Sequence, residues 1–330
     1  MYIKTTFFLF LCLILQNTNA QVLTKIDSIF LKKFQYAMIS KGDNYPDFSS
    51  RKDSMDYLLF CLHEHIPVED FMEKAHFDKD KMDRIILFLE SKDWLHKIGN
   101  IYKPTIFIAS ERDGDSLYKY AAPISKDITN AIISKLPQIK EQFATTNIAA
   151  TDSFAEWNFL ILSNVLLDSW QINNVERDFL KRNERPARHG KYYFQEIAEW
   201  NKQDREAFGI YGNQTIRTKD EKTFSIYGNN RGIKLSRELF DHKIAASDNI
   251  ILENIASSFL PELLTILEKH RTYSEQVYKQ LGYSEEISFD EFFIWWYHFI
   301  YTRSTDELSA KGVLTIPDSG NFYYEMLPSQ

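Results

Sequence analysis

Apolar residues recur at three- and four-residue intervals along much of the chain, which is the repeat of an α-helix that buries one face. The second helix has Ser54 or Asp53 as its predicted cap, and Pro67 stands where a first helical turn tolerates proline. The buried face of the helix over 79–91 is predicted to hold Met82, Ile85, Ile86 and Leu89. In total, helices are predicted over 22–38, 55–62, 67–72, 79–91, 124–143, 154–180, 251–269, 274–281 and 289–308.

Shorter runs rich in β-branched and aromatic residues predict strands. Residues 94–98 and 101–103 flank Gly99-Asn100, which is typical of a β-hairpin with a two-residue turn. Residues 191–197 also read as a strand. The sequence Ile-Tyr-Gly-Asn occurs at 210–213 and again at 226–229, with a polar stretch between, and this predicts a small antiparallel sheet.

The order of elements over residues 53–108, three short helices and then a hairpin, resembles the winged helix–turn–helix superfamily. In such a module the helix over 79–91 takes the recognition position and Gly99-Asn100 forms the tip of the wing. A second, similar pattern runs from Leu308 to Tyr323, because a helix end, an apolar pair and a Gly-Asn recur there in the same order. We therefore expect a second helix-plus-hairpin module over residues 250–327.

The predicted fold class is α+β, predominantly helical, with two helix-plus-β-hairpin modules and a small antiparallel sheet between them. Only 20 residues are Gly or Pro, which favours long uninterrupted helices. The expected segments are a signal peptide (1–20), an N-terminal helix and linker (21–50), a winged-helix-like module (51–120), a helical region (121–190), a small β-rich region (191–245) and a C-terminal helix-plus-hairpin module (246–330).

The first 20 residues have the features of a secretory signal peptide. Lys4 is their one charge, an apolar run covers 7–15, and small residues precede a predicted cleavage between Ala20 and Gln21. We therefore expect an exported bacterial protein that is periplasmic or secreted; the alternative is an uncleaved membrane anchor. After cleavage Cys61 is the one remaining cysteine, so no disulfide can form within the chain. No later stretch is judged apolar enough to span a membrane.

The balance of charge argues against nucleic acid as a partner. The formal charge is −7 and becomes −8 when Lys4 is removed with the signal. Residues 53–110 hold seven basic and eleven acidic side chains, and the acids Asp78, Asp80 and Asp83 alternate with the basic residues of the predicted recognition helix. Because the neutralisation of phosphates dominates affinity for nucleic acids, this surface is poorly suited to DNA.

The densest metal-like group is Cys61-Leu-His63-Glu64-His65. On a helix these side chains point in different directions, so we favour a buried thiol and a polar helix end over a metal site, with His63 and His65 as the weak alternative ligands. No sequence motif of a metalloprotease, serine hydrolase or nucleotide-binding loop occurs, and no cofactor is indicated.

The one concentration of basic residues lies between 177 and 189, with five Lys or Arg against two acids. Arg185, Arg188 and His189 could hold a carboxylate, a phosphate or an anionic glycan, with Trp170 and Tyr192 as neighbouring aromatic side chains; the alternative is a solvated linker. The leading expectation is an exported, non-enzymatic binding or protein-interaction protein. The alternatives are an exported hydrolase with an unmarked acid/base pair and a membrane-anchored winged-helix regulator.

Overall fold

The structure, a computed structural model, describes residues 25–200, 209–218, 222–229 and 240–328. The predicted signal peptide and its cleavage site at Ala20 and Gln21 lie outside these residues. Helices make up 54% of the structure and strands 18%, in several small sheets, so the expectation of a predominantly helical α+β fold is confirmed. The chain forms two compact units. Of the described residues, unit 1 comprises 25–110, 184–200 and 284–291; unit 2 comprises 111–183, 209–218, 222–229, 240–283 and 292–328.

Unit 1 contains, over residues 55–104, the predicted order of three helices and a hairpin. The helices are α2 (Met55–His63), α3 (Val68–Lys74) and α4 (Lys79–Ser91), and the hairpin strands are β2 (Leu95–Ile98) and β3 (Ile101–Pro104). The bounds of α4 and its four buried residues are those predicted. Its first turn is capped because the Asp78 side chain accepts a hydrogen bond from the Lys81 amide at 2.7 Å. One hydrophobic core joins these helices to the sheet of the same unit.

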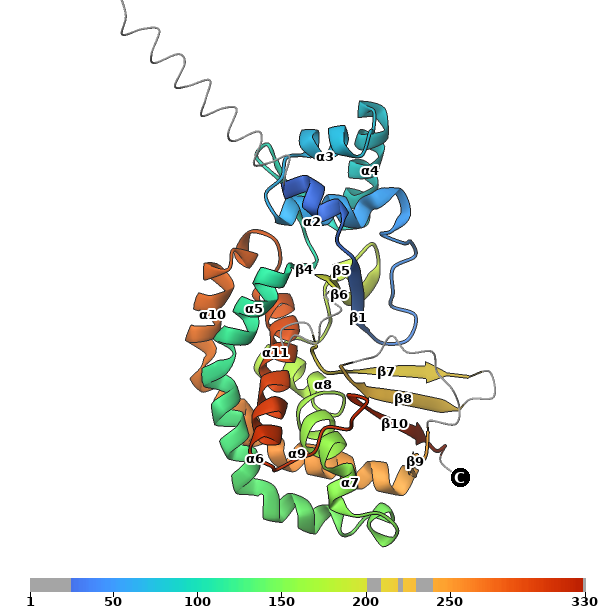
Figure 1. Cartoon of the computed structure of the whole chain (residues 1–330), viewed down its shortest axis with the longest axis vertical. Helices are drawn as coiled ribbons and strands as arrows, with labels where there is room; N and C mark the ends of the chain where they lie inside the picture. The colour runs from blue at the N-terminus through green and yellow to red at the C-terminus, as the bar shows by residue number, and fades with distance from the viewer. Residues whose placement is uncertain (1–24, 201–208, 219–221, 230–239, 329–330) are drawn as a thin grey trace, which may run out of the picture. The chain divides into compact units, whose positions relative to one another are not determined.

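That sheet has the order β1-β6-β4 (Figure 1). Its strands are β1 (Phe34–Ser40), β4 (Phe107–Ala109) and β6 (Lys191–Glu199), and the two-residue β5 (Ala187–Arg188) also pairs with β6. The prediction of one helix over Val22–Met38 is therefore wrong. Residues 25–30 are helical, but 34–40 form a strand antiparallel to β6. Phe30, Phe34 and Met38 are four residues apart, a spacing that keeps side chains on one face in either structure.

The helices of unit 2 were mostly predicted. They include α5 (Glu111–Tyr120), α6 (Ala122–Phe143), α7 (Phe154–Phe159), α8 (Ile172–Asn174), α9 (Ala246–Lys269) and α10 (Arg271–Gln280); α11 (Phe289–Ala310) supplies its last 19 residues to this unit. The predicted helix over 154–180 is not continuous, because a bend and a turn at residues 168–171 interrupt it, and π-helical turns form at Leu160–Val165 and Val175–Phe179.

The second sheet has the order β7-β8-β10-β9. Its strands are β7 (Gly212–Arg217), β8 (Thr223–Gly228), β9 (His242–Ile244) and β10 (Asn321–Met326). The first Ile-Tyr-Gly-Asn segment leads into β7 and the second lies at the end of β8; the two strands are antiparallel, and Gly212 lies opposite Gly228.

The second hairpin predicted over 308–323 does not form. Residues 313 and 314 are not in a strand, and β10 pairs instead with β8 and β9. The Gly320-Asn321 pair that suggested a hairpin tip packs against β8, where a Cβ on Gly228 would lie 2.2 Å from the Gly320 carbonyl oxygen. Close approach of the backbone explains Gly228, whereas Gly320 ends a turn in which its amide donates to the Pro317 carbonyl oxygen at 2.7 Å and has a left-handed backbone with φ of 71°.

Among the described residues, α9 alone is long and apolar enough to cross a membrane by length and composition, so the expectation that no later stretch would qualify is wrong. The same helix buries Leu252, Ile255, Phe259 and Leu263 in unit 2, as the core helix of a folded unit does. Length and hydropathy do not distinguish these two roles, and they are weak support for a membrane span.

Candidate functional site

A groove of about 600 Å³ lies in unit 1 between residues 47–55 and one side of α4. Its apolar lining comes from Phe48, Met55, Ile85 and Phe88. Phe48 packs edge-on against Phe88, with ring centroids 5.2 Å apart, and against the buried Trp94 at 4.8 Å. The groove thus has an aromatic wall that the hydrophobic core of the unit holds in place.

The rim of the groove is rich in cations. Lys52, Lys81, Arg84 and Lys92 line it, against the two carboxylates of Asp47 and Asp53. Lys92 Nζ lies 2.8 Å from Asp47 Oδ2, and Lys81 Nζ lies 3.2 Å from Asp53 Oδ1. The hydrogen bond from Lys92 lowers the pKa of the Asp47 carboxyl, so that this group is ionised at neutral pH.

Two of these cations have no such partner. Lys52 and Arg84 are exposed and form no ion pair or hydrogen bond with any residue that the structure describes. Arg84 lies on the solvent side of α4, one residue before the buried Ile85, and its neighbours Leu87 and Phe88 are 65% and 36% exposed. An unpaired guanidinium beside exposed apolar side chains suits a ligand that carries both a negative charge and an apolar group.

The backbone at the edge of the groove is strained. Asp53 and Ser54 both have left-handed conformations, with φ of 51° and 53°. Such a conformation costs a residue other than glycine about 1 to 3 kcal/mol, and it persists where the surroundings fix it. Ser54 occupies the N-cap position of α2, as predicted, but its side chain makes no capping hydrogen bond. Strain of this kind is common at functional sites.

The two arginines of the loop that was predicted as a binding site are buried inside the protein. The Arg188 side chain is 3% exposed, and it donates to Glu291 Oε2 at 2.5 Å, to the Tyr193 carbonyl oxygen at 2.6 Å and to the Thr105 carbonyl oxygen at 2.6 Å. Arg185 is also buried, and its guanidinium carbon lies 5.8 Å from the centre of the Phe194 ring. The two arginine side chains are therefore neither solvated, as a linker would have them, nor exposed to a ligand.

The other residues predicted for that site have local roles. His189 is exposed, has a left-handed backbone, and donates its amide to Asp93 Oδ2 at 2.8 Å. Tyr192 is 39% exposed, and its amide donates to Asn44 Oδ1. Trp170 belongs to unit 2, where its Nε1 donates to Asn249 Oδ1 at 2.9 Å.

The histidines of the metal-like group lie in a cluster of charged residues. His63 Nδ1 is 2.7 Å from Glu286 Oε2, with both side chains almost fully buried. Lys103 Nζ lies 3.3 Å from His65 Nδ1 and 3.1 Å from Glu285 Oε2. Burial raises the pKa of the Cys61 thiol to about 12, which leaves it protonated and unreactive. No group of three or more His, Cys, Asp or Glu in the described part of the chain is arranged to hold a metal ion.

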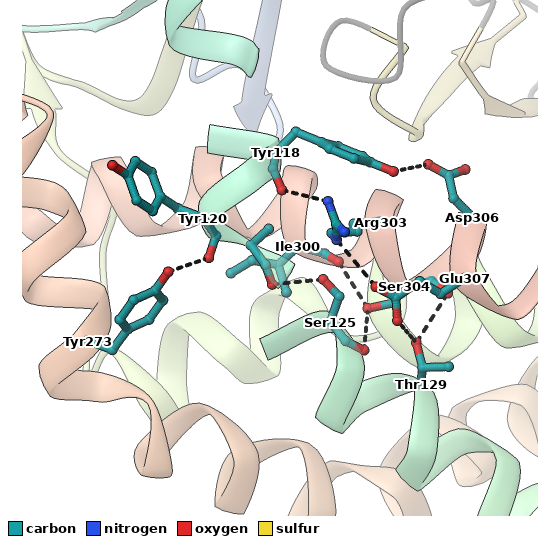
Figure 2. A network of polar contacts seen from close by, with 11 residues as sticks. Tyr118, Tyr120, Ser125, Thr129, Tyr273, Ile300, Arg303, Ser304, Asp306 and Glu307 are labelled. Carbon is teal, nitrogen blue, oxygen red and sulfur yellow. Dashed lines mark hydrogen bonds and ion pairs between the residues drawn. The ribbon is translucent and has the colours of Figure 1, made fainter. Parts of the chain in front are cut away.

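Unit 2 contains a polar network between α11 and the helices α5, α6 and α10 (Figure 2). Tyr118 donates to Asp306 Oδ2 at 2.9 Å, and Tyr211 donates to the other oxygen of the same carboxylate, Asp306 Oδ1, at 3.2 Å. Glu307 accepts hydrogen bonds from Arg303 and Thr129. These carboxylates are occupied by partners within the unit, and we assign them to holding the helices together.

Sequence reasoning missed the groove because its lining residues are spread over 47–92 and include a segment interpreted as a linker. One signal was present: Leu87 and Phe88 are apolar residues of the predicted helix that do not belong to its predicted buried face. Comparisons with known proteins found no family model, no curated protein and no solved structure that matches this chain.

Proposed function

We propose that this protein is an exported binding protein and that the groove beside α4 binds an acidic segment of a partner protein. The observation that carries the proposal is the pair of cations without internal partners, Lys52 and Arg84, at the rim of a groove with aromatic walls. Export rests on the features of residues 1–20. The partner segment would place carboxylates at the rim and an apolar side chain against Phe48 and Phe88.

Both parts of the groove contribute to affinity in this proposal. An aromatic or aliphatic side chain buried against Phe48 and Phe88 supplies hydrophobic free energy, at about 25 cal/mol per Å² of apolar surface removed from water. The cations supply orientation and speed of association, because charges across an interface act on specificity and on-rate more than on affinity.

The chemistry of the groove favours binding over hydrolysis. A hydrolase with two carboxylates needs one of them protonated at working pH, so that it can donate a proton. Asp47 is held in the ionised form by Lys92, and Asp53 lies against Lys81. Asp47 is therefore not prepared to act as a general acid.

The test is a titration of the protein with a fluorescent peptide of about ten residues in which glutamates flank Phe and Leu, followed by anisotropy. The double variant Lys52→Glu/Arg84→Glu should bind the peptide at least about tenfold more weakly, which corresponds to a loss of about 1.4 kcal/mol. The single variant Arg84→Glu has a matched control in Lys126→Glu, an exposed lysine of α6 without a partner among the described residues, because each replaces one cation by an anion.

A second peptide, with glutamine in place of every glutamate, separates the contribution of charge from that of the apolar residues. Equal binding of the two peptides, or equal losses in Arg84→Glu and in Lys126→Glu, would refute the proposed site. Duplex DNA of matched charge is the third probe, and binding to it that depends on Arg84 would favour the winged-helix regulator.

A further inference from the structure

The strand β1 is an edge of the unit 1 sheet, and among the described residues it pairs with β6 alone. In an antiparallel pair, alternate residues direct both backbone groups toward the partner strand. The Trp200 amide donates to the Lys33 carbonyl oxygen at 2.7 Å, which continues the register in which Phe34 lies opposite Glu199. The odd-numbered residues of β1 therefore face β6.

It follows that Phe34, Tyr36, Met38 and Ser40 point their amide and carbonyl groups outward. These groups make no hydrogen bond with the residues that the structure describes. The side chain of Met38, one of these residues, is 41% exposed. The edge is thus a row of unused donors and acceptors with an apolar side chain beside it.

Protein sheets usually protect such an edge with charged residues, proline or a covering element. The other edge of this sheet, β4, is fully buried. In unit 2 the edge strand β7 carries Arg217, and β9 has three residues that include Lys243. By contrast, the seven residues of β1, Phe-Gln-Tyr-Ala-Met-Ile-Ser, include no charge, no proline and no glycine.

We propose that the outer edge of β1 binds an extended segment of a partner protein as an added strand, and that this segment carries acidic residues on both sides of an uncharged stretch. Addition of a strand to an exposed edge is a common mode of peptide recognition, in which backbone hydrogen bonds supply affinity. The inference concerns a different surface from the groove and does not depend on it.

Charge at the two ends of β1 selects this occupant over a second copy of the chain. Lys33 and Lys41 are exposed, and neither forms an ion pair with the described residues. Two copies of β1 paired antiparallel about Ala37 would place Lys33 of one opposite Lys41 of the other, at both ends of the pair. The same lysines attract a foreign strand that has Asp or Glu on either side of its centre.

The first experiment measures amide hydrogen exchange on the full-length protein. The amides of Tyr36 and Met38 should exchange faster than those of Gln35 and Ala37 in the free protein. The probe is an extended peptide with alternating Thr and Val between pairs of glutamates, and its addition should slow Tyr36 and Met38 at least about tenfold. A peptide of the same sequence with alternate backbone nitrogens methylated should have no effect, because it lacks the donors.

The second experiment compares variants of one residue. Met38→Pro removes an outward donor but no hydrogen bond to β6, and proline is tolerated on an edge strand in this position. It should weaken binding of the peptide at least about tenfold, whereas Met38→Thr, which keeps the amide, should stay within about threefold of the parent. Lys33→Glu/Lys41→Glu should also weaken binding, and Arg84→Glu should not.

Each of the other outcomes would overturn the proposal. Unchanged exchange at Tyr36 and Met38, or equal binding by the two Met38 variants, would show that the edge accepts no strand. Self-association in light scattering that Met38→Pro abolishes would make a second copy the occupant. A loss of peptide binding in Arg84→Glu would assign that peptide to the groove.

Discussion

Two basic regions of unit 1 differ in whether their cationic side chains are buried and paired or exposed to solvent. The loop that contains Arg185 and Arg188 directs both guanidinium groups into the protein, and Arg188 is held by a buried carboxylate and two carbonyl oxygens. The groove beside α4 keeps Arg84 and Lys52 in solvent without partners among the described residues. A local excess of arginine therefore does not identify a binding site, because only a cation without an internal partner is available to a ligand.

The largest effect expected from this comparison is on stability. Arg188→Ala would leave the Glu291 carboxylate buried and without its ion pair, and loss of one partner of a buried pair destabilises a protein by about 3 to 5 kcal/mol. Arg84→Ala removes an exposed side chain and should change stability by no more than about 0.5 kcal/mol. Urea unfolding followed by circular dichroism measures both, and equal effects of the two substitutions would contradict the contrast.

The second effect is the response to salt. Association of an acidic peptide with the groove should weaken several-fold between about 0.05 and 0.5 M NaCl, because the Debye length falls from more than 10 Å toward 4 Å. The Arg188–Glu291 pair is shielded from solvent, so the destabilisation caused by Arg188→Ala should stay nearly constant over the same range. Anisotropy and urea titrations at four salt concentrations test the two statements separately.

A smaller change should result from freeing a further cation at the groove. Asp47→Asn removes the partner of Lys92, whose ammonium then becomes available to a carboxylate of the ligand. We expect affinity for the acidic peptide to rise about two- to threefold, as for the gain of one exposed ion pair. The same substitution in the presence of Lys92→Gln should give no gain, and a gain there would mean that Asp47 acts on the peptide directly.

The smallest effect concerns pH at His65. Burial, and then the neighbouring Lys103, lower the pKa of this histidine below its ordinary value of 6.5 in the folded protein. The unfolded chain therefore binds more protons as the pH falls below about 6.5, and the folded state loses stability in that range. His65→Asn keeps a residue that tolerates the left-handed backbone (φ 60°) and should make stability less dependent on pH between about 7.5 and 5. Urea unfolding at several pH values would show this, and a steeper dependence in the variant would reverse the assigned sign.

Local periodicity was enough to predict much of unit 1. The α4 helix has a single apolar stripe, an aspartate cap and no residue that breaks a helix, so its bounds and buried face follow from the sequence. The β2–β3 hairpin follows in the same way from two β-prone runs around Gly99-Asn100. In these elements the decisive interactions lie within a few residues of one another.

The structures that sequence reasoning got wrong depend on partners far away in the chain. Residues 34–40 fit the spacing of a helix and that of a strand, and pairing with β6, more than 150 residues later, selects the strand. Gly320-Asn321 resembles a hairpin tip, but contact with Gly228 makes it the start of β10. Such contacts leave no trace in the local repeat of apolar residues.

The sequence by itself therefore determined the helical character of this protein, the α4 helix, the hairpin and the types of charge present. Only the tertiary structure decided which of the charged side chains are available to a ligand. Arg188 pairs with a buried glutamate that lies 103 residues away in the chain, whereas Arg84 pairs with no acid in the described part of the chain. Both are arginines, so residue type alone could not distinguish them. The physical reason is that burial and pairing are properties of the folded surroundings, which distant segments supply.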